Sequence, residues 1–317
     1  MVDQNLLLMG AAHAHTGDHL RVAAEEGWRI AAVHERDADR RAAICRSEGA
    51  TAVADPDEAL SLGVNAAIVC SETAYHEDDA LAAFASGLPV FCEKPLGIRT
   101  EAARNMNEAA RNAGLLLDTA FFLRTNFALN ALRDRVLEGA IGQVVEARMR
   151  FSHDGGYADW LDLSGWMTDP ALAGFGGFAD EAVHAIDWLQ WTLGPIETGR
   201  AHLGNVLGWP VDDHGAAVFG FANGATATVQ AGWTDTRLRL ELDLVGSEGA
   251  AALADGRVRM WHRGSSDLIW SADLSPLDAG EGIRQFFAAL GRGSGRALVP
   301  PEEAVAVNEV LDLLREG

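Results

Sequence analysis

The chain has 317 residues, which is more than one hydrophobic core usually holds, so we expect two domains. Its 48% hydrophobic and 22% charged residues are typical of a globular protein, and its formal net charge of −21 argues against nucleic acid and anionic membranes as partners. Three cysteines, no basic leader and no apolar run of membrane-spanning length predict a cytoplasmic location with free thiols.

The N-terminal part alternates short apolar runs with helical stretches. The apolar runs expected to form buried strands cover residues 6–9, 29–33, 66–70 and 89–92, and residues 115–117 are expected to start the last strand. Helices are expected up to Gly27, over 37–48, from Asp55 with Pro56 at its first position, up to Gly87 and over 100–114. This repetition predicts an α/β fold, with a Rossmann-type, doubly wound parallel sheet in a dinucleotide-binding domain over residues 1–122.

Ligands of such sheets bind beyond the carboxyl ends of the strands, where Gly10, Glu35, Ser71 and Lys94 fall. The expected dinucleotide turn, G-x-G-x-x-G, keeps only its first glycine at Gly10. Ala12 leaves less room for a pyrophosphate, and His15 replaces the glycine that lets helix and strand pack closely. His13 and His15 lack a third ligand nearby in the sequence, so we expect loop side chains near a cofactor and no metal.

Glu35 ends the second strand, about 25 residues after Gly10, where an acid can bind the hydroxyls of a nucleotide ribose. An acid there repels a 2′-phosphate and favours NAD, whereas the neighbouring Arg36 leaves NADP possible. A solvated strand end is the alternative interpretation of both residues.

Lys94 is the only lysine among the 25 basic residues. A compact, titratable ammonium cannot be replaced by a planar guanidinium that stays charged. Its position after the apolar run 89–92, next to Glu93, therefore indicates a catalytic residue, although a leftover surface lysine would look the same.

From about Val144 the pattern changes to that of an antiparallel sheet. Residues 237–244 alternate leucine with charge and predict four leucines on one face. Asn223-Gly224 and Asp255-Gly256 each separate two strand-like runs and predict hairpins. We expect an α+β domain over residues 123–317 that binds substrate and forms a homodimer or homotetramer through its sheet.

A helix over residues 178–189 follows Gly176-Gly177 and carries Asp180 and His184, which are four positions apart and share one face. Histidine exchanges protons near neutral pH, and a neighbouring carboxylate strengthens it as a base. Alternatively, Asp180 only caps the helix and His184 is a core residue.

Glu93-Lys94-Pro95 together with Gly176-Gly177-x-x-Asp180-x-x-x-His184-x-x-Asp187 resembles the glucose–fructose oxidoreductase, inositol dehydrogenase and rhizopine-catabolism (Gfo/Idh/MocA) family. The resemblance covers nearly the whole chain. It implies that Lys94 hydrogen-bonds the reacting oxygen, that His184 exchanges its proton, and that Asp180 orients His184 or binds a neighbouring hydroxyl. Hydride then passes between the substrate carbon and a nicotinamide.

Two sets of binding residues follow from the residue patterns and the resemblance taken together. The expected cofactor-binding residues are Gly10, Ala12, His13, His15, Glu35, Arg36, Ser71, Glu72, His76, Glu93 and Lys94. The expected substrate-binding residues are Lys94, Arg124, Tyr157, Trp166, Asp180 and His184. The chain departs from the family at the glycine turn, at Ser71-Glu72 where the family has Thr-Pro, and after Arg124, where a proline is often found.

The segment 152–162 combines aromatic rings with carboxylates and has no arginine, which suits a neutral sugar, polyol or related cyclic alcohol. The sequence therefore predicts an NAD(P)-dependent dehydrogenase or reductase for such a substrate. Two alternatives remain, a redox-neutral glycoside cleavage that keeps its NAD and a ligand-sensing regulator without turnover.

Overall fold

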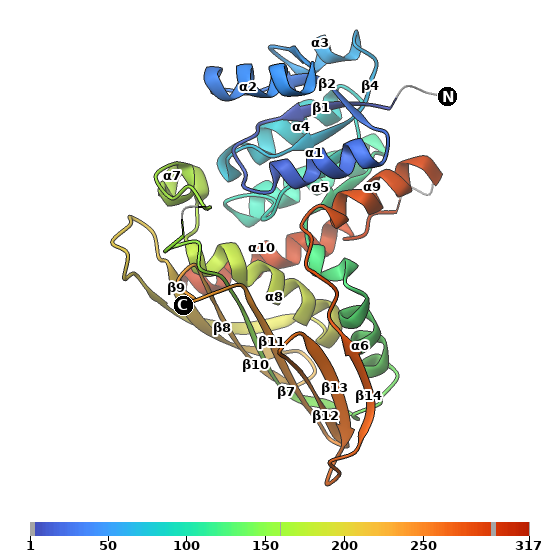
Figure 1. Cartoon of the computed structure of the whole chain (residues 1–317), viewed down its shortest axis with the longest axis vertical. Helices are drawn as coiled ribbons and strands as arrows, with labels where there is room; N and C mark the ends of the chain where they lie inside the picture. Colours follow the sequence, from blue (N-terminus) through green and yellow to red (C-terminus); the bar gives the residue numbers. More distant parts are fainter. Residues whose placement is uncertain (1–3, 159, 293–295, 317) are drawn as a thin grey trace. The chain divides into compact units, whose positions relative to one another are not determined.

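A computed structural model describes residues 4–158, 160–292 and 296–316. The chain divides into two compact units, drawn in Figure 1. Unit 1 comprises residues 1–121, 171–174 and 278–308, and unit 2 comprises 122–170, 175–277 and 309–317. Within the described ranges, no helix is long and apolar enough to cross a membrane.

Unit 1 contains a parallel sheet with the order β3-β2-β1-β4-β5-β6, which confirms the predicted doubly wound fold. Its strands are β1 (Asn5–Met9), β2 (Arg29–His34), β3 (Thr51–Ala52), β4 (Val64–Val69), β5 (Val90–Cys92) and β6 (Leu117–Thr119). All of β1 is buried because the central strand of such a sheet is covered on both faces.

The helices between these strands follow local signals in the sequence. They are α1 (Thr16–Glu25), α2 (Ala38–Glu48), α3 (Pro56–Leu60), α4 (His76–Ala85) and α5 (Thr100–Ala113), with the 3₁₀ turn η1 (Thr73–Tyr75) before α4. The Asp55 carboxylate caps α3 by accepting the Glu58 N–H, and Pro56 is the first residue of the helix, as predicted. Two short elements, η3 (Trp166–Thr168) and α7 (Pro170–Ala173), come later in the chain.

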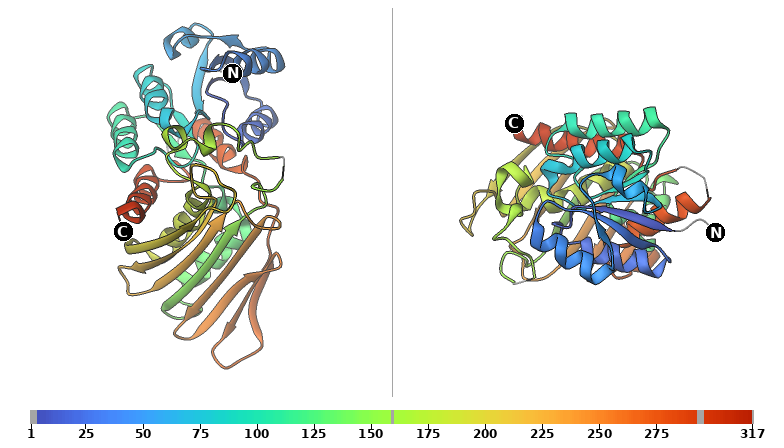
Figure 2. Two further views of the ribbon diagram at one scale, coloured as in Figure 1. Left: turned by 90° about the vertical axis from the view of Figure 1, so that its left-hand side faces the viewer. Right: turned by 90° about the horizontal axis from the view of Figure 1, so that it is seen from above.

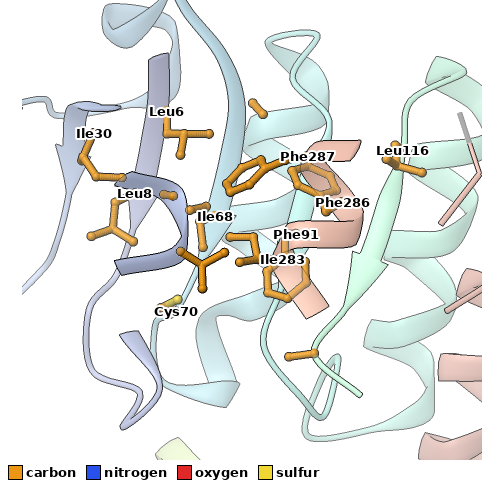
Figure 3. Close-up of a cluster of buried hydrophobic side chains, with 14 of the residues drawn as sticks. Leu6, Leu8, Ile30, Ile68, Cys70, Phe91, Leu116, Ile283, Phe286 and Phe287 are labelled. Atoms are coloured by element: carbon orange, nitrogen blue, oxygen red, sulfur yellow. The ribbon is translucent and has the colours of Figure 1, made fainter. Parts of the chain in front are cut away.

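The core of unit 1 also contains residues from the C-terminal part of the chain. Helix α9 (Glu281–Arg292) inserts Ile283, Phe286 and Phe287 among the side chains of the parallel sheet, as Figure 3 shows. Phe286 packs against Phe91 of β5 with ring centroids 5.8 Å apart. Helix α10 (Pro301–Glu316) begins in unit 1 and ends in unit 2.

Unit 2 contains a mostly antiparallel sheet with the order β14-β13-β12-β11-β7-β10-β9-β8, visible in Figure 2. Its strands are β7 (Val144–Ser152), β8 (Ile196–Gly204), β9 (His214–Phe221), β10 (Thr226–Gly232), β11 (Arg239–Gly246), β12 (Gly249–Ala254), β13 (Arg257–His262) and β14 (Leu268–Asp273). Only the β7–β10 pair is parallel among the strand pairs of this described sheet. Both predicted hairpins are present, as β9–β10 and β12–β13.

The prediction of four leucines on one face of the strand at 237–244 is wrong at its first position. Strand β11 begins at Arg239, and Leu238 lies outside it with 53% of its surface exposed. The other three leucines, Leu240, Leu242 and Leu244, are buried. Arg239 pairs with Ser152, which is the last residue of β7. Strand β11 therefore begins at Arg239, because β7 offers no residue with which Leu238 could pair.

Helix α8 (Gly177–Leu193) packs against β7, β9 and β10 and contacts α6 (Phe127–Leu137), which follows the 3₁₀ turn η2 (Phe122–Thr125). Figures 1 and 2 show α6 and α8 on the same face of the sheet. Trp188, Leu189 and their apolar neighbours on α8 are fully buried, so this helix forms the core of unit 2.

Candidate active site

Lys94 lies just past the end of β5, at the carboxyl edge of the parallel sheet, as predicted. Only 2% of its surface is exposed, which excludes the alternative of a surface lysine. Its backbone N–H donates to the carboxylate of Glu93 at 3.0 Å. A buried ammonium at this edge is a directional donor shielded from bulk water, as a residue that polarises a reacting oxygen needs to be.

Glu93 is fully buried and lies among three histidines from the β1–α1 turn and from α1. His19 Nε2 is 2.5 Å from Glu93 Oε1, while His13 Nε2 and His15 Nδ1 are each 3.5 Å from a Glu93 oxygen. Burial opposes ionisation, but the three histidines hold the pKa of the Glu93 carboxyl well below its usual range. Glu93 is therefore an anion surrounded by imidazole rings.

The turn after β1 is tightly packed despite its missing glycines. Gly10 has φ +72°, and a Cβ there would lie 2.3 Å from the Cα of Ser71, so glycine is required at this position. The Ser71 hydroxyl is buried and has no hydrogen-bond partner in the described part of the chain. A glycine-only approach and an unsatisfied hydroxyl beside the N-terminus of α1 fit a dinucleotide at this edge.

Glu35 directly follows β2, and its carboxylate already has four donors. The N–H groups of Ala11 and Asp37 and two nitrogens of Arg40 contact it at 2.7–3.1 Å. Burial raises the pKa of the Glu35 carboxyl, but Arg40 and the two N–H groups lower it more, so Glu35 is ionised. A carboxylate accepts about four hydrogen bonds, so ribose hydroxyls would have to share or displace these donors.

The neighbouring charges form pairs with one another. Arg40 also binds Glu72 at 2.9 Å, and Arg36 binds Asp79 at 2.7 Å while its guanidinium stacks over Tyr75. A 2′-phosphate would therefore compete with Asp79 for Arg36, which is consistent with a preference for NAD.

His76 begins α4 and has no exposed surface. Its ring nitrogens face the carbonyl oxygens of Pro95 at 2.9 Å and Ser71 at 3.1 Å. Burial lowers the pKa of His76, and the neutral ring, which has a single N–H, can donate to only one of these two carbonyl oxygens at a time. Its predicted contact with a cofactor remains a prediction.

In unit 2, Asp180 and His184 lie one turn apart on α8, as predicted. The indole N–H of Trp233 donates to Asp180 at 2.9 Å. The distant Asp212 accepts the Phe178 N–H at 2.8 Å and so caps α8, a role that the alternative interpretation gave to Asp180.

His184 is 1% exposed and packs against two aromatic rings that also contact each other. Its ring centroid is 4.6 Å from that of Phe122 and 5.4 Å from that of Phe151. These two ring contacts hold the imidazole in one orientation, which a group that exchanges a proton with a substrate needs.

The remaining predicted substrate residues differ in exposure. Arg124 is buried and forms a bidentate ion pair with Asp187 of α8, at 2.9 and 2.5 Å. Tyr157 is 63% exposed and Trp166 is half-buried. Arg124 is therefore held by a protein carboxylate, and contact of these three residues with a substrate remains a prediction.

Several residues of these clusters were not predicted. His19 of α1 follows the N-cap residue His15 by four positions and could have been found from that spacing. Trp233 and Asp212 contact α8 in unit 2 and Arg40 contacts Glu35 in unit 1, each from another element, and no local pattern marks them.

Comparison with known proteins places both parts of the chain in one family. Residues 5–121 match the model described as "Oxidoreductase family, NAD-binding Rossmann fold", and residues 129–252 match the GFO/IDH/MocA C-terminal domain. A 1,5-anhydro-D-fructose reductase of Ensifer adhaerens is 32% identical over 203 residues, which is 62% of this chain and 57% of the relative. Inositol 2-dehydrogenase 2 of Saccharopolyspora erythraea is 35% identical over 200 residues, 62% of this chain and 54% of the relative.

Solved structures share the fold over almost the full length. An oxidoreductase from Agrobacterium radiobacter in complex with NAD+, L-tartaric acid and magnesium has a TM-score of 0.83 at 18% identity, covering 99% of this chain and 96% of that one. Levoglucosan dehydrogenase with NADH and levoglucosan has a TM-score of 0.82 at 20% identity, covering 99% and 97%. The alignments with the curated relatives span little more than half of those relatives' length. Because the family models of both domains match, the chain belongs to the GFO/IDH/MocA family of oxidoreductases.

Proposed function

We propose that the chain is an NAD-dependent dehydrogenase or reductase acting on a hydroxyl or carbonyl carbon of a sugar, polyol or related cyclic alcohol. The observation that carries this proposal is the burial of the only lysine at the carboxyl edge of the parallel sheet, in a chain whose α8 presents Asp180 and His184 on one face. The relatives named above act on compounds of this class by their names.

In the proposed mechanism, Lys94, Asp180 and His184 act on one substrate. The Lys94 ammonium donates a hydrogen bond to the reacting oxygen and stabilises its negative charge. His184 takes the hydroxyl proton during oxidation and returns it during reduction. Asp180, positioned by the Trp233 N–H, orients His184 or accepts a hydrogen bond from a neighbouring hydroxyl. When bound, the nicotinamide accepts or supplies the hydride.

We assign residues 1–122 to cofactor binding and residues 123–317 to substrate binding and assembly. Subunits are proposed to meet through the antiparallel sheet as a dimer or tetramer, in the cytoplasm, where the free thiols of Cys45, Cys70 and Cys92 would persist. Light scattering after size-exclusion chromatography tests the assembly, and a monomer would contradict it.

The function is tested by incubating the protein with sugars and polyols, with either NAD+ or NADP+, and recording absorbance of the reduced nicotinamide. We expect stoichiometric reduction with NAD+ for at least one substrate. Lys94→Met should lower kcat by about 10³-fold or more, while folding and NAD+ affinity stay near those of the wild type. Unchanged activity in that variant, or product release without net reduction of NAD+, would contradict the proposal.

A further inference from the structure

The Lys94 segment, residues 94–97, lies between β5 and α5 and belongs to neither element. All four residues are within the described ranges and are buried, although they form no strand or helix. Backbone groups in such a segment lack the regular partners of a sheet or helix, so side chains often bind them. The position of the Lys94 ammonium therefore depends on contacts that reach this segment from other elements.

Asn308 of α10 binds the end of the Lys94 segment. Its side-chain N–H donates to the Gly97 carbonyl oxygen at 2.7 Å, across 211 positions of sequence. Both residues belong to unit 1 and both are buried, Asn308 with 1% of its surface exposed. The contact therefore joins the C-terminal helix to the Lys94 segment inside one compact unit.

Two further hydrogen bonds hold the start of the segment. The Lys94 N–H donates to the Glu93 carboxylate at 3.0 Å. A ring nitrogen of His76 lies 2.9 Å from the Pro95 carbonyl oxygen, but the same neutral ring also faces the Ser71 carbonyl oxygen and has one N–H to donate. The start is therefore held by one full and one shared hydrogen bond, and the amide on α10 adds an anchor at the other end.

An amide at position 308 is an unfavourable choice for stability alone. Its buried neighbours on α10 are apolar side chains, namely Ala304, Val305, Val307 and Leu311. The Asn308 Oδ1 atom is buried and has no hydrogen-bond partner among the described residues. An unsatisfied buried oxygen costs stability, and an apolar side chain would avoid that cost. The hydrogen bond that the described residues give this amide is the one to Gly97, so its effect falls on the Lys94 segment.

We propose that Asn308 is a positioning residue for Lys94, and that it acts by fixing the Gly97 carbonyl and with it the backbone from which the ammonium extends. Only two residues separate Gly97 from Lys94, so a displacement of one carries the other with it. A misplacement of about 1 Å in a reacting group can lower a rate by about 100-fold. The inference rests on the proposed function and adds to it a residue that no motif around Lys94 contains.

The first test uses the fact that Lys94 is the only lysine of the chain. Its rate of acetylation by acetic anhydride, followed by mass spectrometry of the peptide that contains it, reports how firmly the side chain is held. Asn308→Val removes both the donor and the unsatisfied Oδ1, so we expect a stability close to that of the wild type. Lys94 should nevertheless be acetylated about tenfold faster in this variant, because the segment opens more often.

Val305→Ala, three positions earlier on α10, is the matched control. It shortens a buried side chain and should lower the stability through a cavity, while Lys94 is acetylated at the wild-type rate. A wild-type acetylation rate in Asn308→Val, or an equal increase in both variants, would overturn the role of Asn308.

Kinetics on the substrate found in the screen provide the second test. Asn308→Val should lower kcat by about tenfold with a smaller change in KM, because the ammonium is misplaced. Lys94→Met and Lys94→Met/Asn308→Val should have the same residual kcat, since a residue that acts through Lys94 has no effect once the ammonium is gone. A further loss in the double variant would show that Asn308 acts by another route and would sink the inference.

The two tests separate this inference from the proposed function. A wild type that reduces no NAD+ with any sugar or polyol would contradict the proposed function. Acetylation needs neither cofactor nor substrate, so its rates decide in that case too whether Asn308 holds Lys94 in place.

Discussion

Trp233 connects the end of β10 to Asp180 through one hydrogen bond, and the whole indole is buried. A neutral N–H donor stabilises the carboxylate and fixes its direction without adding a charge to the site. The Asp180 carboxylate therefore keeps one orientation in each turnover. The geometry of the proposed proton transfer depends on this orientation.

Trp233→Phe keeps most of the ring volume and removes the donor, so we expect kcat to fall by about tenfold with a smaller change in KM. Steady-state kinetics on the substrate found in the screen measures this. Trp261→Phe, on β13 and distant in sequence from the site, is the control and should keep its kcat. Equal losses in both variants would show that the effect is one of general packing.

Arg124 and Asp187 form an ion pair in which both side chains are at least 98% buried. Removing one partner leaves an uncompensated charge in the core, so Arg124→Met should destabilise unit 2 by about 3–5 kcal/mol. The double variant Arg124→Met/Asp187→Leu should recover most of this loss. Guanidinium unfolding curves of the three proteins provide the test, and a double variant as unstable as the single one would contradict it.

At the scale of elements, Gly177 is the first residue of α8. The atoms packed around it leave no room for a side chain, whereas its own backbone dihedral angles would allow one. A Cβ on Gly177 would lie 2.6 Å from the Asp213 carbonyl oxygen and 2.8 Å from the Trp233 ring. Close approach of the helix to the β10 end therefore sets the position of Trp233 relative to Asp180.

Gly177→Ala should lower the free energy of unfolding by about 1–3 kcal/mol, because backbone atoms have to move. Gly17→Ala in α1 is the opposite case, since nothing lies within 4 Å of the added methyl group. That variant should gain about 0.5–1 kcal/mol from helix propensity. Chemical denaturation of both proteins measures the contrast, and shifts of the same sign would contradict the packing argument.

The elements that could be predicted are those with local determinants. Buried strands such as β1, capped helices such as α3 and the hairpin at Asp255-Gly256 depend on residues within a few positions of one another. Helix α9 could not be assigned to the first sheet, because Phe286 meets Phe91 across almost two hundred positions of sequence that carry no common pattern. The same limit hid Trp233 from the predicted site, whereas the motif around Lys94 was contiguous.

For the whole molecule, acid stability depends on carboxylates that are ionised in the fold. Asp235 follows β10 and ties the end of β7 to the start of β11 through Ser152, Arg150 and Arg239. Burial alone would raise the pKa of its carboxyl, but the hydrogen bonds and the two guanidinium groups lower it to about 2. A carboxyl whose pKa is lower in the folded state stabilises the fold at every pH above its ordinary pKa of 3.8. This stabilisation is lost as the pH falls from there towards about 2.

Asp235→Asn should therefore cost unit 2 about 2 kcal/mol at neutral pH, and the difference from the wild type should shrink between about pH 4 and pH 2. Tryptophan fluorescence is a suitable probe, because all of the nine tryptophans except Trp28 lie in unit 2. Other carboxylates also titrate in this range, so the quantity to follow is the difference between the two unfolding free energies. A difference that stays constant from pH 7 to pH 2 would mean that Asp235 contributes through packing and not through its charge.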